Sequence, residues 1–430
     1  MLTGRYPASH GAYRNGNDAF PAHETLVTKT LADAGYDCGL IGKLHLSAAK
    51  LYERRPDDGY RVFHWSHHPT PDFARGHEYE SWLRVEKGVD PQALFRNVAG
   101  FCGPGAPAAL SQSTWCGEMG IRFIEERRDT PWLLSINFFD PHAPFDAPPE
   151  YLAEVDPETL PLPLWRDSDA ERWQDFAGVD QQQVRPRDPR IRGRGRTGAE
   201  ARPETHDDFA SNVPDSYDAL EVKANYYAMI QQIDAQVGRL VEALRRTGQL
   251  DNTIVLYHSD HGEQLGDHGL MLKGCRFFDG LVRVPMIWSW PGRFAEGLES
   301  RALVELVDIA PTLLKALGLP QPWPMQGRSL LPILDGRADP DRHKSHVVSE
   351  FWDSIGGRPD HTHGSMVFDG RWKSVVYHGH PVGEIFDHAA DPGEFDNLWD
   401  DPALRAERLK VHLDALAGTI SSGPPRILDY

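Results

Sequence analysis

The 430-residue sequence predicts an α/β fold in which a large, mixed but mostly parallel sheet is flanked by helices. Two observations predict the large sheet and its flanking helices. Amphipathic helices are followed by short apolar strands, as in repeated βα units, and three strands end in cationic or metal-ligating side chains. A third observation is a change near residue 346, where short apolar runs separated by Gly, Asp and Pro predict a small antiparallel sheet. We therefore expect a large domain at residues 1–345 and a C-terminal α+β subdomain at residues 346–430.

Two helix–strand pairs are predicted in the first third of the chain. Residues 23–34 place apolar side chains on one helical face and are followed by Gly35, a helix stop. The apolar strand 38–41 comes next. A second helix at 112–127 leads into an apolar strand at 132–139. Since helix and strand form only half of a βαβ unit, a further strand is expected before the first helix.

The helix at residues 217–247 has the clearest pattern in the sequence. Its apolar side chains recur at spacings of three, four and seven residues, which predicts one buried stripe. Strand 254–257 follows it directly, and strand 286–290 and helix 308–317 come next. Helix again precedes strand, as in a doubly wound sheet.

Other regions are predicted to be less regular. Residues 51–109 are rich in aromatic residues, His, Gly and Pro, which predicts long loops with short elements. Residues 183–208 are rich in Arg, Gly and Pro, which predicts an exposed loop insertion. In the C-terminal subdomain we expect a closing helix and short strands, at residues 402–417 and at 347–348, 366–368, 373–377 and 384–386.

The composition limits the classes of partner. The net charge of −18 argues against a general nucleic-acid binder or an anionic-membrane binder. No apolar run approaches the roughly 18 residues of a membrane span. A disulfide framework is not expected, because the four cysteines are widely spaced and form no C-x-x-C pair. Cytoplasmic and periplasmic or secreted locations both stay open, as does the oligomeric state.

Three predicted strands deliver polar side chains at their carboxyl ends. These side chains are Lys43, His45, His142, Asp260 and His261. In parallel sheets these ends share one edge, where ligands bind, so we expect the side chains to converge on a cation or an anionic substrate. The alternative for Asp260 and His261 is a turn in which they cap neighbouring backbone groups.

A hard cation such as Ca²⁺ or Mg²⁺ would need more oxygen ligands than Asp260 alone supplies. The near candidates are Asp140, Glu263 and Asp267. The sequence contains no H-E-x-x-H zinc motif, no G-x-S-x-G nucleophile elbow and no P-loop. Metalloprotease, serine-hydrolase and P-loop NTPase chemistries are therefore not indicated.

Several segments together resemble the type I sulfatases of the alkaline phosphatase superfamily, over nearly the whole chain. Gly42-Lys43-Leu44-His45-Leu46 is similar to the family's G-K-W-H-L, and Asp140-Pro141-His142-Ala143-Pro144 to its P-H-x-P. Leu2-Thr3-Gly4-Arg5 resembles the end of the family signature that begins C-x-P-S-R. The other similar segments are Ser259 to Glu263, Lys273, Val307 to Thr312, Gln326 to Leu330, Gly383 to Asp387 and Asp391 to Glu394.

This resemblance implies a fold and an activity. The fold would be the alkaline phosphatase/sulfatase type, and the activity hydrolysis of a sulfate ester in a sulfated small molecule or saccharide. The implied roles are sulfate binding for Lys43 and Lys273, protonation of the leaving alcohol for His142, and support of the nucleophile for His45 and Arg5. Cationic groups at developing negative charge stabilise a transition state electrostatically, which fits these roles.

The resemblance also implies cofactors. Asp260 and His261 would bind a divalent cation, usually Ca²⁺, with Mg²⁺ or Mn²⁺ as alternatives. The family's nucleophile is a formylglycine made within C-x-P-S-R, a motif that these 430 residues do not contain. We expect that motif directly before Met1, with a first strand and two metal aspartates further upstream, and an inactive chain without them. A hydrophobic slot should then remain in the sheet. The alternatives are a phosphonate or phosphate ester hydrolase of the same fold, and a non-catalytic anion-binding protein.

Overall fold

The computed structural model describes most of the chain. The described residues are 1–12, 20–46, 55–67, 77–96, 101–176, 178–179, 188–191, 217–352 and 362–421. Of the predicted loop insertion 183–208, only residues 188–191 lie within these ranges. No helix in them is long and apolar enough to cross a bilayer.

The N-terminal part is built on a parallel sheet, as predicted. Strands β1 (Asp37–Gly42), β2 (Tyr60–Trp65) and β3 (Trp132–Asn137) are ordered β2-β1-β3, and both strand pairs are parallel. The strand β2 lies in the region predicted as loops with short elements. Its sequence mixes charged and aromatic residues and shows no clean apolar run.

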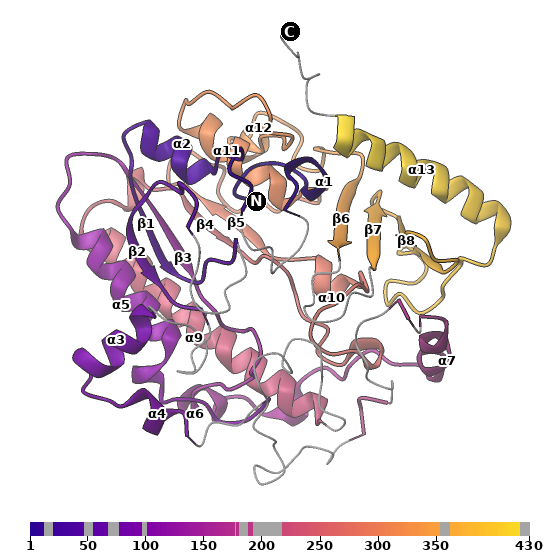
Figure 1. Ribbon diagram of the computed structural model, residues 1–430, viewed down its shortest axis with the longest axis horizontal. Coiled ribbons are helices and arrows are strands. Elements are labelled where there is room, and N and C mark those ends of the chain that lie inside the picture. Colours follow the sequence, from indigo (N-terminus) through magenta and orange to yellow (C-terminus); the bar gives the residue numbers. More distant parts are fainter. Residues whose placement is uncertain are drawn as a thin grey trace.

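Helices cover both faces of this sheet (Figure 1). On one face, α2 (Val27–Asp33) and α11 (Ile309–Ala316) pack against Cys38 and Leu40 of β1. On the other face, α3 (Glu78–Val85) and α5 (Gln112–Glu125) pack against Ile41. The alternation along β1 is that of a strand buried on both faces.

The helix predicted at residues 23–34, which corresponds to α2, is shorter in the structure. It begins at Val27 rather than at residue 23, because Leu26 has an extended backbone and the chain before it is used for other contacts. The Glu24 carboxylate is buried and pairs with the Arg5 guanidinium. The Val27 amide donates to the Leu2 carbonyl at 2.7 Å. These contacts fasten the N-terminal loop to the start of α2.

The long helix α9 (Ala219–Arg246) lies across α5 and leads into β4 (Val255–His258). Strand β4 pairs with β5 (Met286–Ser289) in an antiparallel two-stranded sheet. In the described part of the chain, no ladder joins β4 to the sheet of β1, β2 and β3. The α/β core therefore contains two separate pieces of sheet.

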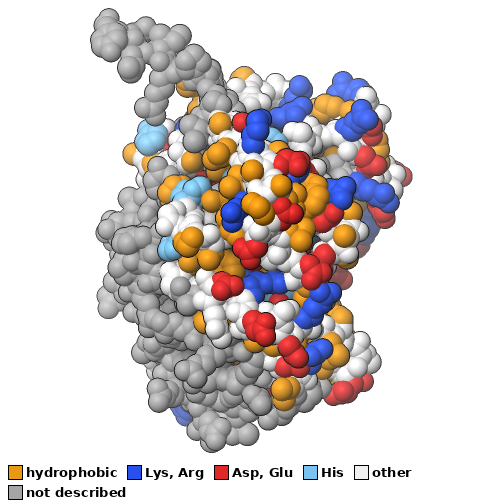
Figure 2. All heavy atoms as spheres, turned by 90° about the vertical axis from the view of Figure 1, so that its right-hand side faces the viewer, with side chains coloured by type: hydrophobic (Ala, Val, Ile, Leu, Met, Phe, Trp, Pro, Cys, Tyr) orange, Lys and Arg blue, Asp and Glu red, His pale blue; other side chains and the backbone are white. Residues whose placement is uncertain are grey.

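The C-terminal part contains the predicted antiparallel sheet. Strands β6 (Val347–Trp352), β7 (His363–Phe368), β8 (Trp372–Tyr377) and β9 (Gly383–Asp387) form it in that order, and α13 (Pro402–Ser421) lies over it. Figure 2 looks onto this side, where acidic, basic and hydrophobic side chains are interspersed. The mixed α/β fold class is confirmed. The division at residues 345 and 346 stays a prediction.

The other α-helices of the described residues are short. They are α1 (Pro7–His10), α4 (Pro91–Leu94), α6 (Pro149–Leu152), α7 (Asp167–Asp175), α10 (Asp279–Val282) and α12 (Leu331–Leu334).

Candidate functional site

Side chains from three separate parts of the chain meet beyond the ends of β3 and β4. Lys273 Nζ lies 2.6 Å from His142 Nε2 and 3.3 Å from His261 Nε2. The rings of His142 and His261 are 6.5 Å apart between centroids. Lys43 is close enough for its charge to affect the pKa of His142, Asp260 and Lys273. Of the predicted site residues, these five form one cluster.

The backbone at the end of β1 fixes the position of Lys43. The Lys43 amide donates to the Asn137 carbonyl at 2.8 Å, and the Asn137 side-chain amide donates to the Lys43 carbonyl at 2.7 Å. Gly42 has φ +98°, and a Cβ there would lie 2.1 Å from the Asn137 oxygen. Only glycine fits this close approach of β1 and β3. The Lys43 ammonium then lies 5.3 Å from the centroid of the Phe139 ring.

Both histidines of the cluster are held in the neutral form. Burial and the charge of Lys273 lower the pKa of His142 well below its ordinary value, and they lower the pKa of His261 to about 4. The Nδ1 atoms lie 2.7 Å from the Ala143 carbonyl and 2.8 Å from the Gly262 carbonyl, so each Nδ1 carries the donated proton. Each Nε2 lone pair therefore points into the site and accepts from Lys273.

Burial and the proximity of two like charges disfavour the ammonium forms of the two lysines. Burial, followed by the charge of Lys43, lowers the pKa of Lys273 to about 8. Burial also lowers the pKa of Lys43, and Asp260 opposes that shift. Partial desolvation acts to raise the pKa of Asp260, but the nearby ammonium groups of Lys43 and Lys273 help to bring it below the ordinary value. Two ammonium groups in one cluster suit the binding of a tetrahedral oxyanion.

Asp260 and His261 supply two ligand atoms for a cation. His261 Nε2 lies 3.7 Å from Asp260 Oδ2, and 67% of the Asp260 side chain is exposed. The other predicted carboxylates have different partners: Asp140 accepts from Ser113, Glu263 from the Gln264 amide, and Asp267 from the Leu164 amide. Hard cations take about six to eight oxygens. The described residues therefore do not complete a site for such an ion.

A second group of residues is of a type that could bind a metal, but a lysine occupies the space between them. Asp279, His388 and Glu394 bring their ligand atoms within 4.8 Å of one another. The Lys373 ammonium lies among them, 2.7 Å from Asp279 Oδ1 and 2.5 Å from Glu394 Oε1. Lys373 is itself buried. We assign this group to structural charge pairing.

Two further predicted site residues, His45 and Arg5, have described contacts with residues outside the cluster. The His45 ring makes an edge contact with His67 at 4.9 Å, and the His67 ring lies 5.9 Å from Phe139, which contacts His142. The Arg5 guanidinium pairs with Glu24 and donates to the Ser9 carbonyl at 2.8 Å. Its predicted support of a nucleophile stays a prediction.

Sequence reasoning missed Phe139 and Asn137 as parts of the site. Phe139 packs on His142 with ring centroids 4.7 Å apart, and it lies beneath Lys43. Both residues belong to the apolar run that signals a strand, so neither stood out by type. Their positions at the strand end, beside Gly42 and His142, were the only available signal.

The half-buried carboxyl of Asp140 should make stability depend on pH. Burial raises its pKa to about 6, although the hydrogen bond from Ser113 opposes the shift. The folded state then binds a proton more tightly than the unfolded state. The contribution of the Asp140 carboxyl to the free energy of unfolding is fully present below the unfolded pKa near 4. It is lost as pH rises through about 6.

We compare the free energy of unfolding of Asp140→Asn with that of the wild type. Between pH 4.5 and pH 7.5 this difference should shift in favour of the variant by about 2 kcal/mol. Urea unfolding of both proteins at the two pH values measures this difference. Asp129→Asn, at an exposed position, is the control. Equal free-energy differences at both pH values would contradict the assignment.

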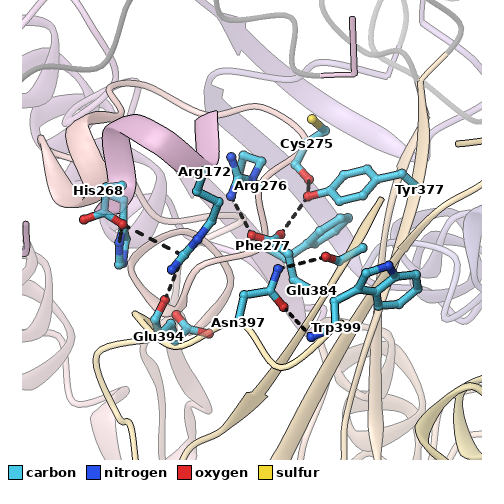
Figure 3. A network of polar contacts seen from close by, with 12 residues as sticks. Arg172, His268, Cys275, Arg276, Phe277, Tyr377, Glu384, Glu394, Asn397 and Trp399 are labelled. Atoms are coloured by element: carbon cyan, nitrogen blue, oxygen red, sulfur yellow. Dashed lines mark hydrogen bonds and ion pairs between the residues drawn. The ribbon is translucent and has the colours of Figure 1, made fainter. Parts of the chain in front are cut away.

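The loop that carries Lys273 is fastened to the C-terminal sheet (Figure 3). Arg276 Nη2 donates to Glu384 Oε1 at 2.5 Å. The Tyr377 hydroxyl lies within hydrogen-bond distance of two acceptors, the Cys275 carbonyl at 3.1 Å and Glu384 Oε2 at 2.9 Å. Arg276 and Glu384 are both buried. These contacts set the path of the backbone two and three residues after Lys273.

Comparisons with known proteins identify the family of this chain. The family Sulfatase matches residues 1–319, and N-sulphoglucosamine sulphohydrolase, C-terminal, matches residues 266–417. An arylsulfatase of Clostridium perfringens is 26% identical over 97% of this chain and 81% of its own. A phosphonate monoester hydrolase of Agrobacterium radiobacter has a TM-score of 0.75 at 25% identity, with 98% of this chain and 85% of that chain covered.

A further solved structure has the same fold and is described as a complex with its substrate D-glucosamine-2-N,6-O-disulfate. Its TM-score is 0.70 at 20% identity, with 100% of this chain and 88% of that chain covered. The second family match begins just before the Lys273 loop and extends through the antiparallel sheet. That range agrees with the contacts that fasten the loop to β8 and β9.

Proposed function

Because the chain belongs to the sulfatase family, we propose that it hydrolyses sulfate esters, of a sulfated small molecule or a sulfated saccharide, at the cluster of Lys43, His142 and Lys273. The observation that carries this proposal is the contact of Lys273 with both His142 and His261, in a cluster that also includes Lys43. Relatives named arylsulfatase support the reaction class of sulfuric ester hydrolysis. The family as a whole places the chain in the alkaline phosphatase superfamily.

In this proposal the two lysines bind the sulfuryl oxygens. A bound dianion or monoanion relieves their mutual repulsion and favours their charged forms. It also raises the pKa of His142, whose imidazole is neutral without it. His142 Nε2 accepts from Lys273 Nζ, so a proton can reach the leaving alcohol oxygen through this pair.

Asp260 and His261 are the cation ligands that we propose for this chain, with Ca²⁺ as the first choice and Mg²⁺ or Mn²⁺ as alternatives. The neutral His261, held by the Gly262 carbonyl, has the form of a metal ligand with its supporting hydrogen bond. A bound cation would supply neutralisation of charge on the anion. The two donors do not complete a site, so the roles above rest on the lysines and His142.

The second candidate is a phosphonate or phosphate ester hydrolase. The similarity to a phosphonate monoester hydrolase favours it, because the same pocket chemistry accepts either tetrahedral anion. The third candidate is a protein that binds the anion without turnover. None of the cluster residues is a serine, threonine or cysteine that would act as the nucleophile.

The test uses two forms of the protein: the 430-residue chain, and the same chain carrying ahead of Met1 a segment with a first strand, its two metal aspartates and C-x-P-S-R, coexpressed with the modifying enzyme. We propose that only the second form turns over an aryl sulfate, and that both bind inorganic sulfate in calorimetry. The matched control is the same segment with its Cys replaced by Ala. Faster turnover of an aryl phosphonate would favour the second candidate. Sulfate binding without turnover in either form would favour the third, and turnover by the 430-residue chain would contradict the role of the segment.

A further inference from the structure

A cavity with no part in the proposed chemistry lies between β2, α3 and α5, on the face of the sheet that these helices cover (Figure 1). Its volume is about 310 Å³, at the lower end of the range of about 300–1,000 Å³ for small-molecule pockets. Lys43, His142 and Lys273 are not among the described residues that line it. It is therefore a separate candidate site, and what it binds does not depend on the proposed hydrolysis.

The floor of this cavity is aromatic and held in place by packing. Trp82 of α3 and Trp115 and Phe123 of α5 form it, with exposed fractions of 3%, 1% and 4%. All three belong to one packed core cluster. Trp82 Nε1 also donates to Glu118 at 3.2 Å, which fixes the orientation of its ring. Because such side chains have little freedom to move, the cavity is preformed, and a ligand gains the contact without reorganising the core.

Charged side chains surround the mouth of the cavity, and most of them neutralise one another. Arg122 donates to both carboxylate oxygens of Glu86, with 2.8 Å between Nη1 and Oε1. The third lining carboxylate, Glu126, belongs to a group of two carboxylates and two guanidinium groups in mutual contact: Asp37, Glu126, Arg61 and Arg128. Positive and negative charges therefore balance within each of these two groups.

Glu78, the first residue of α3, lies in a different environment. Within the described residues its ion-pair partner is His64 of β2, whose Nδ1 lies 3.9 Å from Glu78 Oε2. Both residues line the cavity, and their side chains are 49% and 41% exposed. A separation of 3.9 Å is too long for a hydrogen bond. The mouth therefore has one carboxylate whose charge no arginine or lysine of the described ranges balances.

From these observations we infer that the cavity binds a small organic cation, an ammonium group joined by a short chain to a flat aromatic ring. The ring would lie against the aromatic floor, which offers both apolar area and attraction for a cation. The ammonium would pair with Glu78. An anionic ligand would instead meet Glu78, Glu86 and Glu126, against the single lining guanidinium of Arg122. The volume admits one fused two-ring system with such a chain.

The test uses the 430-residue chain and three indole probes that differ only at the end of the side chain. Tryptamine carries an ammonium, tryptophol a neutral hydroxyl and indole-3-propionate a carboxylate. In saturation-transfer NMR titrations we expect tryptamine to bind with a Kd on the order of 10⁻⁴ to 10⁻³ M. Tryptophol should bind about threefold more weakly, because one half-exposed ion pair is lost, and indole-3-propionate about tenfold more weakly.

Three protein variants locate the binding site. Glu78→Gln should weaken tryptamine binding by about threefold and leave tryptophol binding unchanged, because only the ammonium pairs with that carboxylate. Glu80→Gln is the matched control, since Glu80 lies on the same helix, pairs with Arg84 and is not a lining residue. Ser81→Phe places a ring in the cavity from an exposed lining position and should abolish saturable binding of both probes.

Several results would overturn the inference. Equal affinity for tryptamine and tryptophol, or tighter binding of indole-3-propionate, would show that Glu78 does not set the charge preference. Unchanged binding in a Ser81→Phe variant that unfolds in urea like the wild type would place the probes elsewhere. No saturation by tryptamine up to about 10 mM would show that the cavity is not a binding site for this class of ligand.

Discussion

Replacing Lys273 by alanine is expected to lower kcat/KM for an aryl sulfate by about 10²- to 10³-fold in the form that carries the C-x-P-S-R segment, since it removes a preorganised charge at the sulfuryl oxygens. In the 430-residue chain it should raise the Kd for inorganic sulfate by about 10- to 100-fold, the range for one charge-assisted hydrogen bond. Lys273 is the expected centre of this effect because it contacts both His142 and His261.

The control for this prediction is Lys315→Ala, which removes an exposed lysine of α11. Imidazole NMR supplies a readout that does not depend on turnover. The charge of Lys273 helps to lower the pKa of His142, so that pKa should rise in Lys273→Ala. Unchanged sulfate affinity together with an unchanged His142 titration would show that Lys273 is not part of the anion site.

The residues of the site were easier to predict than their arrangement. Lys43, His142, Asp260 and His261 follow apolar runs, and the carboxyl ends of strands are where an α/β sheet binds ligands. Lys273 follows no strand, and only the family resemblance pointed to it. Its place is set by contacts about 100 residues away in sequence, such as that between Cys275 and Tyr377, which local pattern does not encode.

In the fold, too, local sequence pattern predicted some elements, whereas contacts between distant residues set others. Helix α9 was predicted within two residues at its start and one at its end, because its apolar stripe has one period over 28 residues. Strand β2 was not singled out, because the contacts of its residues with β1 and α3 outweigh a weak local pattern. The early start predicted for α2 failed because Glu24 pairs with Arg5 instead of continuing a helix.

The antiparallel sheet has a direct part in shaping the anion site. Lys373 on β8 contacts the Phe277 carbonyl at 3.0 Å and Asp279, while Tyr377 and Glu384 contact residues 275 and 276. The loop therefore has partners on two strands of that sheet within a few residues of Lys273. Any change that loosens these contacts should move the Lys273 ammonium relative to Lys43, which β1 and β3 hold independently.

Replacing Glu384 by alanine is expected to cost about 3–5 kcal/mol of unfolding free energy, because it leaves the buried Arg276 guanidinium without its carboxylate partner. Arg276 and Glu384 are only 4% and 1% exposed, and Tyr377 also donates to Glu384. The Arg276 guanidinium lies against the Phe176 ring, 3.8 Å from its centroid, so water has little access to it.

Urea unfolding measures this loss, and Asp396→Ala is the control, since Asp396 and its partner Arg166 form an exposed pair at 3.0 Å. That pair should contribute about 0–1 kcal/mol. Where Glu384→Ala still folds, its sulfate affinity should also fall, because the Lys273 loop has lost an anchor. Glu384→Gln keeps an acceptor for Arg276 and should lose less stability. A loss below about 1 kcal/mol in Glu384→Ala would show that Arg276 finds water or another partner, and that the sheet does not hold the loop through this pair.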